Sequence, residues 1–337
     1  KRGATDFIAK PWQNEKVVAT VSAAYKLRRS RAETIALRQT NEVLIRDASS
    51  VNRKIIGESS QIREVLNVVD RAAPTDANVL ILGENGSGKE VIALEVHRQS
   101  RRAAQVFLSI DMGSISESLF ESELFGHRKG SFTGADEDRI GRIMAANHGT
   151  LFLDEIGNLP LHLQAKLLSV LEQREVTAVG SHTAQPFDVR IVTATNVPAN
   201  ELRDPERFRP DLLFRLNTVE IVVPPLRDRK DDILPIASHF LAEFSRRYGG
   251  TERSFSDAAK SALLDYEWPG NVRALRHAIE RAVILAEADI IEPGDLQLDY
   301  AETRPDVTPS VMPTILNLDH LEKETILKAL RKHGFNI

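Results

Sequence analysis

A glycine-rich segment, residues 83–89, combines residue types that suit the binding of phosphate groups. It follows the apolar run 78–82 and precedes the amphipathic stretch 90–97, so we expect it to join a strand to a helix. There, glycines let backbone N–H groups converge on phosphate oxygens, the helix dipole adds positive potential, and a lysine reaches the terminal phosphates. The candidate nucleotide-binding residues are Gly83, Glu84, Asn85, Gly86, Ser87, Gly88, Lys89 and Glu90. Glu90 stands where such a loop normally carries a magnesium-binding Ser or Thr, which leaves Ser87 or water for that role.

Two adjacent acids, Asp154 and Glu155, end the apolar run 149–153. An acidic pair after a buried strand can simply cap the next turn. Downstream of a phosphate loop the pair also suits nucleotide hydrolysis: Asp154 would hold Mg²⁺, directly or through water, and Glu155 would polarise the water that attacks the γ-phosphate. We predict Asp154 and Glu155 as the Mg²⁺ and catalytic site, with ATP and Mg²⁺ as cofactors.

Two arginines, Arg209 and Arg215, lie between the apolar runs 189–192 and 219–223. Arginine is common on protein surfaces, and either side chain could belong to an ordinary ion pair. Their location also allows them to reach the γ-phosphate bound by a neighbouring subunit, where such a finger contributes about 10³ to 10⁵ in rate. We predict the second role, which requires a homo-oligomer.

The segment 268–273 predicts a turn and then a helix that begins at Val272, with Asn271 as the capping residue. Arg273 falls in the first turn of this helix. Its side chain is a candidate contact to the nucleotide.

The segment 130–135 places an aromatic residue between glycines, in the order Gly130, Ser131, Phe132, Thr133, Gly134 and Ala135. One interpretation is an ordinary turn with a buried Phe132. The other is an exposed, mobile loop that presents Phe132 to a partner, since flanking glycines supply hinges.

The composition is that of an ordinary globular chain, with 337 residues, 42% of them hydrophobic, and a net charge of −4. The absence of cysteine excludes disulfides, thiol catalysis, iron–sulfur clusters and cysteine-ligated zinc. There is no apolar run of about 18 residues and no secretory signal at the start, so we expect a cytoplasmic protein without membrane contact. The charge balance gives no general basic excess for nucleic acid.

The hydrophobic pattern predicts how these residues are positioned. Between residues 53 and 228, short apolar runs alternate with helix-length amphipathic stretches, which is typical of an α/β domain with a buried parallel sheet. Residues 229–298 show helical patterns only and predict a small all-helical domain. A helical linker is expected over 15–52, and prolines indicate a second linker over 299–316.

Together these segments resemble the central ATPase of bacterial enhancer-binding proteins, the NtrC-like activators of sigma-54 RNA polymerase in the AAA+ class. The resemblance runs from about residue 56 to residue 296 and includes four motifs in the family's order: 121–127, 130–135, 153–156 and 268–273. It implies an AAA+ P-loop parallel-sheet domain with a helical lid, and an ATP-hydrolysing ring, from dimer to hexamer or heptamer. Such a ring remodels the closed complex of RNA polymerase, and its loop 130–135 touches the sigma factor.

The resemblance also implies a role for each matching residue. Lys89 would bind phosphates, Asp154 magnesium and Glu155 the attacking water. Arg209 and Arg215 would be fingers in trans, Arg273 the second sensor, Thr195 and Asn196 the first sensor, and Ile56 and Gly57 would lie against the adenine.

This sequence departs from the family pattern at three positions. Ser131 replaces an Ala in the loop, and Ala274 replaces a Glu after the sensor arginine. Asp111 stands where the family has an Asn that restrains the catalytic Glu. Asp can accept a hydrogen bond there but cannot donate as an amide does, so coupling of hydrolysis to loop movement is less firmly implied than hydrolysis.

Both ends resemble parts of other domains. Residues 6–11 look like the last strand and Lys-Pro turn of a receiver domain, so we interpret 1–14 as its remnant. Residues 317–337 look like the first helix of a truncated Fis-type helix-turn-helix. A sensor kinase and enhancer DNA would then be partners only through a complete receiver domain and a complete C-terminal domain.

Two other hypotheses remain. Another AAA+ machine, such as an unfoldase or helicase loader, is disfavoured by the segment 130–135. A DNA-binding regulator in which nucleotide only sets the oligomeric state is disfavoured by Glu155, Arg209 and Arg215.

Overall fold

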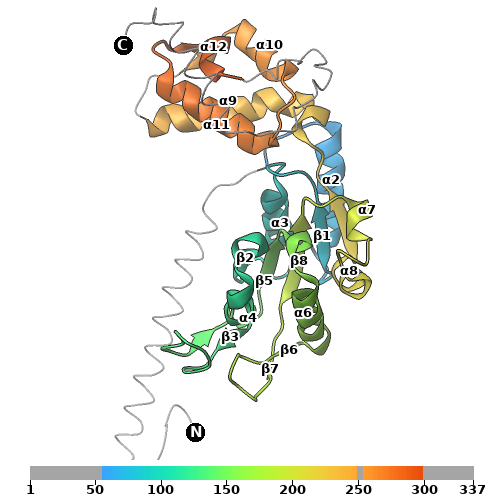
Figure 1. The fold of residues 1–337 in the computed structure, drawn as a ribbon. Helices are drawn as coiled ribbons and strands as arrows, with labels where there is room; N and C mark the ends of the chain where they lie inside the picture. The colour runs from blue at the N-terminus through green and yellow to red at the C-terminus, as the bar shows by residue number, and fades with distance from the viewer. Residues whose placement is uncertain (1–54, 249–252, 299–337) are drawn as a thin grey trace, which may run out of the picture. The chain divides into compact units, whose positions relative to one another are not determined.

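The computed structural model describes residues 55–248 and 253–298 (Figure 1). The expected receiver remnant, the helical linker 15–52, the second linker and the Fis-type helix lie outside these residues. The chain divides into two compact units, 1–297 and 298–337. In the described part of the chain, no helix has the length and apolar character needed to cross a membrane.

A five-stranded parallel sheet forms the centre of the α/β part, with the strand order β2-β5-β8-β1-β9. The strands are β1 (Val79–Leu82), β2 (Phe107–Asp111), β5 (Thr150–Asp154), β8 (Arg190–Thr195) and β9 (Val219–Val222). β1 and β8 are buried along their whole length. β1 is accordingly a continuous apolar run rather than an alternating one, whereas β8 also buries Arg190, Thr193 and Thr195. The predicted α/β parallel-sheet fold is confirmed.

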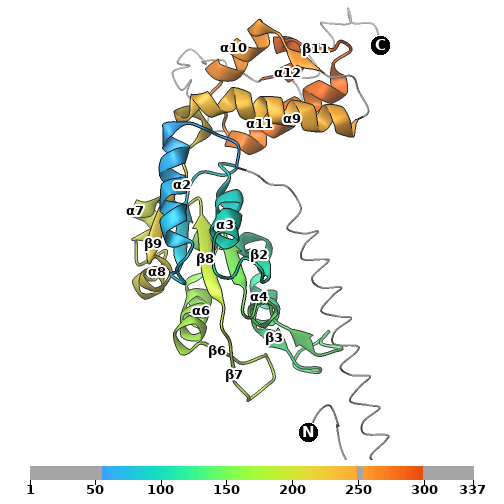
Figure 2. The same ribbon diagram turned by 180° about the vertical axis from the view of Figure 1, so that it is seen from behind.

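Helices cover both faces of this sheet (Figures 1 and 2). One face carries α2 (Ser60–Ala72) and α3 (Lys89–Arg98), and the other carries α4 (Glu117–Phe125), α5 (Arg142–Ala145), α6 (Leu161–Gln173) and α8 (Pro210–Leu216); the short α7 (Ala199–Leu202) precedes α8. Successive strand residues point to opposite faces. Val79 and Ile81 therefore belong to the α2/α3 core, and Leu80 and Leu82 to the other.

Short elements project from this frame. They are the antiparallel pairs β3 (Gly126–His127) with β4 (Arg139–Ile140) and β6 (Glu175–Val176) with β7 (Gln185–Pro186), and the 3₁₀ turns η1 (Met112–Ser114), η2 (Ile156–Asn158), η3 (Leu226–Asp228) and η4 (Lys230–Asp232). Two-residue strands carry no periodic pattern, so the sequence did not predict them.

The C-terminal part contains α9 (Ile233–Arg247), α10 (Asp257–Asp265), α11 (Asn271–Leu285) and α12 (Pro293–Leu296). Trp268 is 1% exposed and donates its indole N–H to the Leu263 carbonyl at 2.8 Å, which fixes the turn before α11. The expectation of helices only was wrong in one respect. β10 (Ser254–Phe255) and β11 (Ile290–Ile291) form a small parallel sheet, again too short to leave a pattern.

Candidate nucleotide-binding and hydrolysis site

The phosphate loop lies where the sequence places it, between β1 and the start of α3. Gly86 and Gly88 have φ values of 74° and 107°, a region that favours glycine. Lys89 is 6% exposed, and its Nζ donates to the carbonyls of Gly83 and Glu84 at 2.9 and 3.2 Å. Burial lowers the pKa of Lys89, and the charges of Asp154 and Glu155 oppose this effect. Because β1, β8 and β5 are parallel neighbours, the loop that follows β1 and the acids at the end of β5 lie at the same edge of the sheet.

The loop fits a bound phosphate group. Among the described residues, the buried Ser87 hydroxyl has no hydrogen-bond partner, and no atom stands within 4 Å of a Cβ built at Gly88. The first N–H groups of α3 therefore border open space, and the hydroxyl beside them is available to an oxygen ligand.

Asp154 ends β5, beside Asp111 at the end of β2. Its Oδ1 accepts the backbone N–H of Glu155 at 3.0 Å. Burial raises the pKa of Asp154, with the charges of Asp111 and Glu90 acting in the same direction and that of Lys89 opposing them. No group of three or more His, Cys, Asp or Glu residues in the described ranges could hold a metal by itself. A carboxylate pair with phosphate and water ligands is nevertheless the usual environment of Mg²⁺.

Glu155 has an unusual backbone conformation, with φ 58° and ψ 33°. A non-glycine residue in the left-handed region costs free energy, and such residues cluster at functional sites. The Glu155 carboxylate accepts a hydrogen bond at 2.5 Å from Asn158 Nδ2 in the turn η2. The sequence did not indicate Asn158, because an amide three residues after an acid becomes a signal only once the left-handed turn at Glu155 is known.

The first-sensor candidates end the neighbouring strand β8. The Thr195 hydroxyl accepts the Val197 N–H at 3.1 Å. Asn196 Oδ1 is buried without a hydrogen-bond partner among the described residues. Asn196 therefore offers an unused polar atom at the carboxyl edge of the sheet, the edge where the phosphate loop begins.

Asn271 contacts the phosphate loop, and its predicted capping role was wrong. The N-cap of α11 is Gly270, without a side-chain cap, and α11 begins at Asn271 itself. The Asn271 side chain accepts the Leu226 N–H at 2.7 Å and donates to the Glu84 carboxylate at 3.0 Å and to the Asn85 carbonyl at 3.1 Å. Glycine at the cap position frees Asn271 for these long-range bonds.

Further contacts hold the loop from outside. Arg227 donates twice to the Glu84 carboxylate, at 2.6 and 2.9 Å, and together with Asn271 it lowers the Glu84 pKa to about 2. Arg229, 4% exposed, donates to the Ser87 carbonyl at 2.6 Å. Neither arginine was predicted. Arg273 was predicted to contact the nucleotide. It lies beside the phosphate loop, since a Cβ built at Gly86 would be 2.8 Å from the Arg273 Cβ.

The adenine candidates, Ile56 and Gly57, precede α2. The buried Asp232 carboxylate fixes this segment: it accepts the N–H groups of Glu58 and Ser59 at 2.7 and 2.8 Å. Its second oxygen lies 2.8 Å from a Cβ built at Gly57. Any larger residue at 57 would displace Asp232.

The arginine-finger candidates lie at the two ends of α8. Arg209 pairs with Asp211 at 2.7 Å, and Arg215 donates to the Leu171 carbonyl at 3.1 Å. The Arg215 carbonyl accepts a bond from Asn78, which precedes β1, whereas the phosphate loop follows β1. At about 3.3 Å per residue the two ends of β1 are roughly 13 Å apart, beyond the reach of an arginine side chain.

The segment 130–135 forms the tip of the β3–β4 hairpin. The tip is closed by the Gly130 N–H donating to the Ala135 carbonyl at 2.8 Å, and Arg128 pairs with Asp138 below it at 2.6 Å. Phe132 is 38% exposed and its ring packs edge-on against His127. Phe132 is thus partly exposed, with its ring in contact with His127.

At the base of the hairpin, the chain passes very close to itself. A Cβ built at Gly141 would lie 2.3 Å from the Phe125 carbonyl carbon, and one at Gly126 would lie 2.5 Å from the Arg139 carbonyl oxygen. Glycine is required at both positions. Ser131, the departure from the family pattern, packs against Gly180, whose Cβ would stand 2.6 Å from the Ser131 Cβ.

Comparison with known proteins decides the family. The Sigma-54 interaction domain matches residues 55–222, and the AAA+ ATPase lid domain matches residues 227–312. The transcriptional regulatory protein ZraR of Klebsiella oxytoca is 40% identical over 336 residues, covering 100% of this chain and 74% of ZraR. The chain belongs to the family of sigma-54-dependent response-regulator activators.

Other members of this family are similar over nearly the whole chain. The C4-dicarboxylate transport regulator DctD of Rhizobium meliloti is 39% identical over 331 residues, covering 98% of this chain and 69% of DctD. The crystal structure of NtrX from Brucella abortus in complex with ADP has a TM-score of 0.69 and 28% identity, covering 100% of this chain and 74% of NtrX. A complex of NtrX with ATP is also known.

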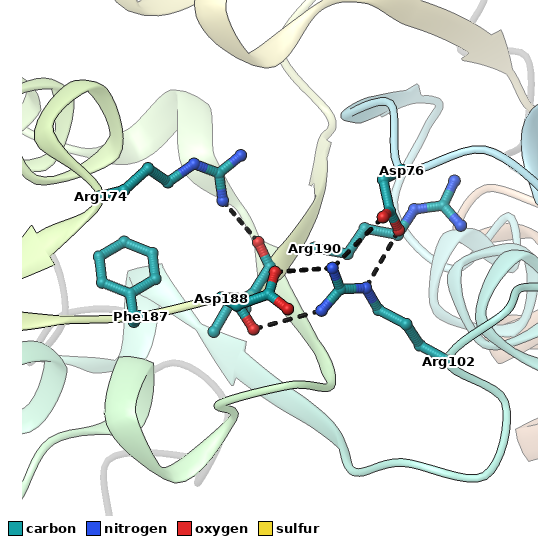
Figure 3. Close-up of a pocket in the computed structure, with 7 residues that line it drawn as sticks. Asp76, Arg102, Arg174, Phe187, Asp188 and Arg190 are labelled. Atoms are coloured by element: carbon teal, nitrogen blue, oxygen red, sulfur yellow. Dashed lines mark hydrogen bonds and ion pairs between the residues drawn. The ribbon is translucent and has the colours of Figure 1, made fainter.

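In this sigma-54 activator chain, a cavity of about 260 Å³ lies at the opposite, amino-terminal edge of the sheet (Figure 3). Arg102 joins Asp76 at 3.0 Å to Asp188 at 2.7 Å, and Arg190, 1% exposed, donates to the carbonyls that end α2. None of the predicted site residues lines this cavity. The network ties α2 and α3 to β8 and is structural.

Proposed function

We propose that this sigma-54 activator hydrolyses ATP and uses the energy to remodel the closed complex of sigma-54 RNA polymerase through the loop 130–135. The observation that carries the proposal is that the loop with Lys89, which follows β1, and the acids Asp154 and Glu155, which follow each other at the end of β5, share the carboxyl edge of the parallel sheet. The proposal includes the division of this part of the chain that the sequence predicts, into an ATPase domain, 53–228, and a lid, 229–298.

The phosphates would lie on the backbone N–H groups that begin α3. Lys89 has three N–H donors, of which two hold the carbonyls of Gly83 and Glu84. The third is then directed to a phosphate oxygen. ATP binding by this chain is supported by the NtrX complexes with ATP and ADP.

Magnesium, bound together with the nucleotide, would neutralise charge on the phosphate oxygens. Asp154 would hold it, directly or through water. The pKa of Asp154 is raised by burial, and a nearby cation reverses that effect, so cation and carboxylate favour each other. Glu155 would orient the attacking water and accept its proton, with one carboxylate oxygen held by Asn158.

Arg209 and Arg215 would complete the site of a neighbouring subunit, and Arg215 lies at the end of β1 opposite the phosphate loop of its own chain. Phe214, between them on α8, is 84% exposed. An apolar side chain so exposed beside both arginines supports a contact surface on α8. The partners in this proposal are other copies of the chain and sigma-54 RNA polymerase, with enhancer DNA and a sensor kinase bound through complete terminal domains.

The decisive experiment compares two variants. Glu155→Ala should bind ATP as tightly as the parent and lose hydrolysis, because it removes the water-orienting carboxylate and leaves Lys89 in place. Lys89→Ala should lose binding as well. Turnover of Glu155→Ala at near the parental rate would show that the catalytic assignment is wrong.

A further inference from the structure

The turn after the catalytic carboxylate is closed twice. The backbone N–H of Asn158 donates to the Glu155 carbonyl at 3.0 Å, and its side-chain amide donates to Glu155 Oε2 at 2.5 Å. The Glu155 N–H is itself engaged by Asp154 at 3.0 Å. These bonds set both the left-handed backbone of Glu155 and the direction of its side chain.

The surroundings make the amide of Asn158 unusual, because the nearest side chains on β2 and β5 are acids. A Cβ built at Gly113 would lie 3.3 Å from Asp111 Oδ1, 3.8 Å from Glu155 Cβ and 3.9 Å from Asn158 Nδ2. These three side chains therefore border one small space. Asp111 accepts the Gly113 N–H at 2.9 Å, and an ionised carboxylate has no proton to donate. Of the two side chains that face Glu155 across this space, Asn158 is the one that can donate.

The bond to Oε2 has a consequence for the other oxygen. The bond from the amide to Oε2 restricts rotation of the carboxylate, and Oε1 remains for the attacking water of the proposed mechanism. Without this bond the Glu155 side chain could rotate away from the acid Asp111, which carries the same charge. A misplacement of about 1 Å can cost about 10²-fold in rate.

We propose that Asn158 is the positioning residue for Glu155 and that it supplies, from η2, the amide that position 111 does not supply in this chain. This inference rests on the proposed function, because it takes Glu155 as the hydrolytic carboxylate. It predicts that a donor at either position 158 or position 111 is required for fast hydrolysis.

The test uses Asn158→Asp, which keeps the shape of the side chain and replaces the donor by an acceptor. The kcat for ATP should fall about 10- to 100-fold, with KM and the affinity for a fluorescent ATP analogue within about two-fold of the parent. The double variant Asn158→Asp with Asp111→Asn returns a donor to the same space and should recover most of the lost kcat. A merely structural role of Asn158 predicts no such rescue.

Gln99→Glu is the matched control, since it breaks another amide–carboxylate bond, from Gln99 to Glu95 at 3.0 Å, near the far end of α3. Its kcat should equal the parental value. A kcat within two-fold of the parent for Asn158→Asp overturns the inference, and so does a loss that Asp111→Asn fails to restore. Glu155→Gln distinguishes a failure of the proposed function from a failure of this inference. If Glu155→Gln hydrolyses ATP normally, the proposed function is wrong. If Glu155→Gln is inactive while Asn158→Asp hydrolyses ATP normally, only the inference about Asn158 is wrong.

Discussion

Gly86 of the phosphate loop lies directly against Gly270 at the entry to α11. A Cβ built at Gly86 would stand 2.2 Å from the Gly270 carbonyl oxygen and 2.8 Å from the Arg273 Cβ. Only glycine permits this approach, and its φ of 74° also favours glycine. The lid helix and the phosphate loop are therefore in backbone contact, and the Asn271 side chain bonds across the same junction.

We expect Asn271→Ala to destabilise the protein and to weaken ATP binding. The variant leaves the buried N–H of Leu226 without its acceptor and releases Glu84 and Asn85. An unsatisfied buried group costs about 1–3 kcal/mol, so the free energy of unfolding should fall by that amount or slightly more. Denaturant unfolding and nucleotide titration measure the two effects.

Arg227→Ala is the control for this prediction. It removes an exposed ion pair to the same Glu84, and exposed pairs contribute about 0–1 kcal/mol. Equal losses in the two variants would mean that the Glu84 carboxylate, and not the buried bond to Leu226, carries the stability.

Hydrolysis should depend on assembly, because we propose that Arg209 and Arg215 act on a neighbouring subunit. The specific ATPase activity of the parent should rise with protein concentration. Mixing Arg209→Ala subunits with Glu155→Ala subunits should restore part of the activity, since some interfaces then pair an intact arginine with an intact glutamate. Co-assembled mixtures that remain as inactive as each variant alone would contradict the role in trans.

Thr133→Ala should separate hydrolysis from work on the sigma factor. Thr133 is exposed at the hairpin tip, and the bond from Gly130 to Ala135 does not involve its side chain. ATPase activity should stay within a few-fold of the parent, while nucleotide-dependent sigma-54 binding and open-complex formation are lost. Glu137→Ala, exposed just outside the tip, is the control and should retain both. Normal promoter opening by Thr133→Ala would make the segment 130–135 a structural turn.

His97 should make the stability of the protein sensitive to mild acid. It is 4% exposed, its Nδ1 lies 2.9 Å from the Thr150 hydroxyl, and burial lowers its pKa from 6.5 to about 4. Between these values the unfolded chain binds more protons than the folded chain, so stability falls as the pH falls. From pH 7.5 to pH 5 this histidine alone should remove about 2 kcal/mol of unfolding free energy. The loss should be smaller by that amount in His97→Gln, measured by denaturant unfolding at both pH values.

The sequence predicted the elements whose burial leaves a pattern. The central strands are apolar on both faces, and α2 buries Ile62, Val65 and Val69 at helical spacing, so runs and periods revealed them. The phosphate loop and the acids that end β5 were found because each lies within one short segment.

Contacts between distant segments could not be predicted in this way. Asn271 follows a cap-like turn, and nothing local shows that its amide bonds to Glu84, 187 residues away. Arg229 likewise looks like a surface residue, yet it is buried under Ser87. Asn158 is the opposite case: its partner is three residues away, but an amide after an acid has no meaning until the left-handed turn at Glu155 is known.

The hairpin that carries Phe132 is closed at its base by Gly126 and Gly141 and again by Arg128 with Asp138. Because these closures do not use the side chains of 130–135, the tip is a candidate for grafting. Chimeras that exchange only these six residues with a relative such as ZraR should fold as the parent does, and they would test whether the tip alone carries the proposed contact with the sigma factor.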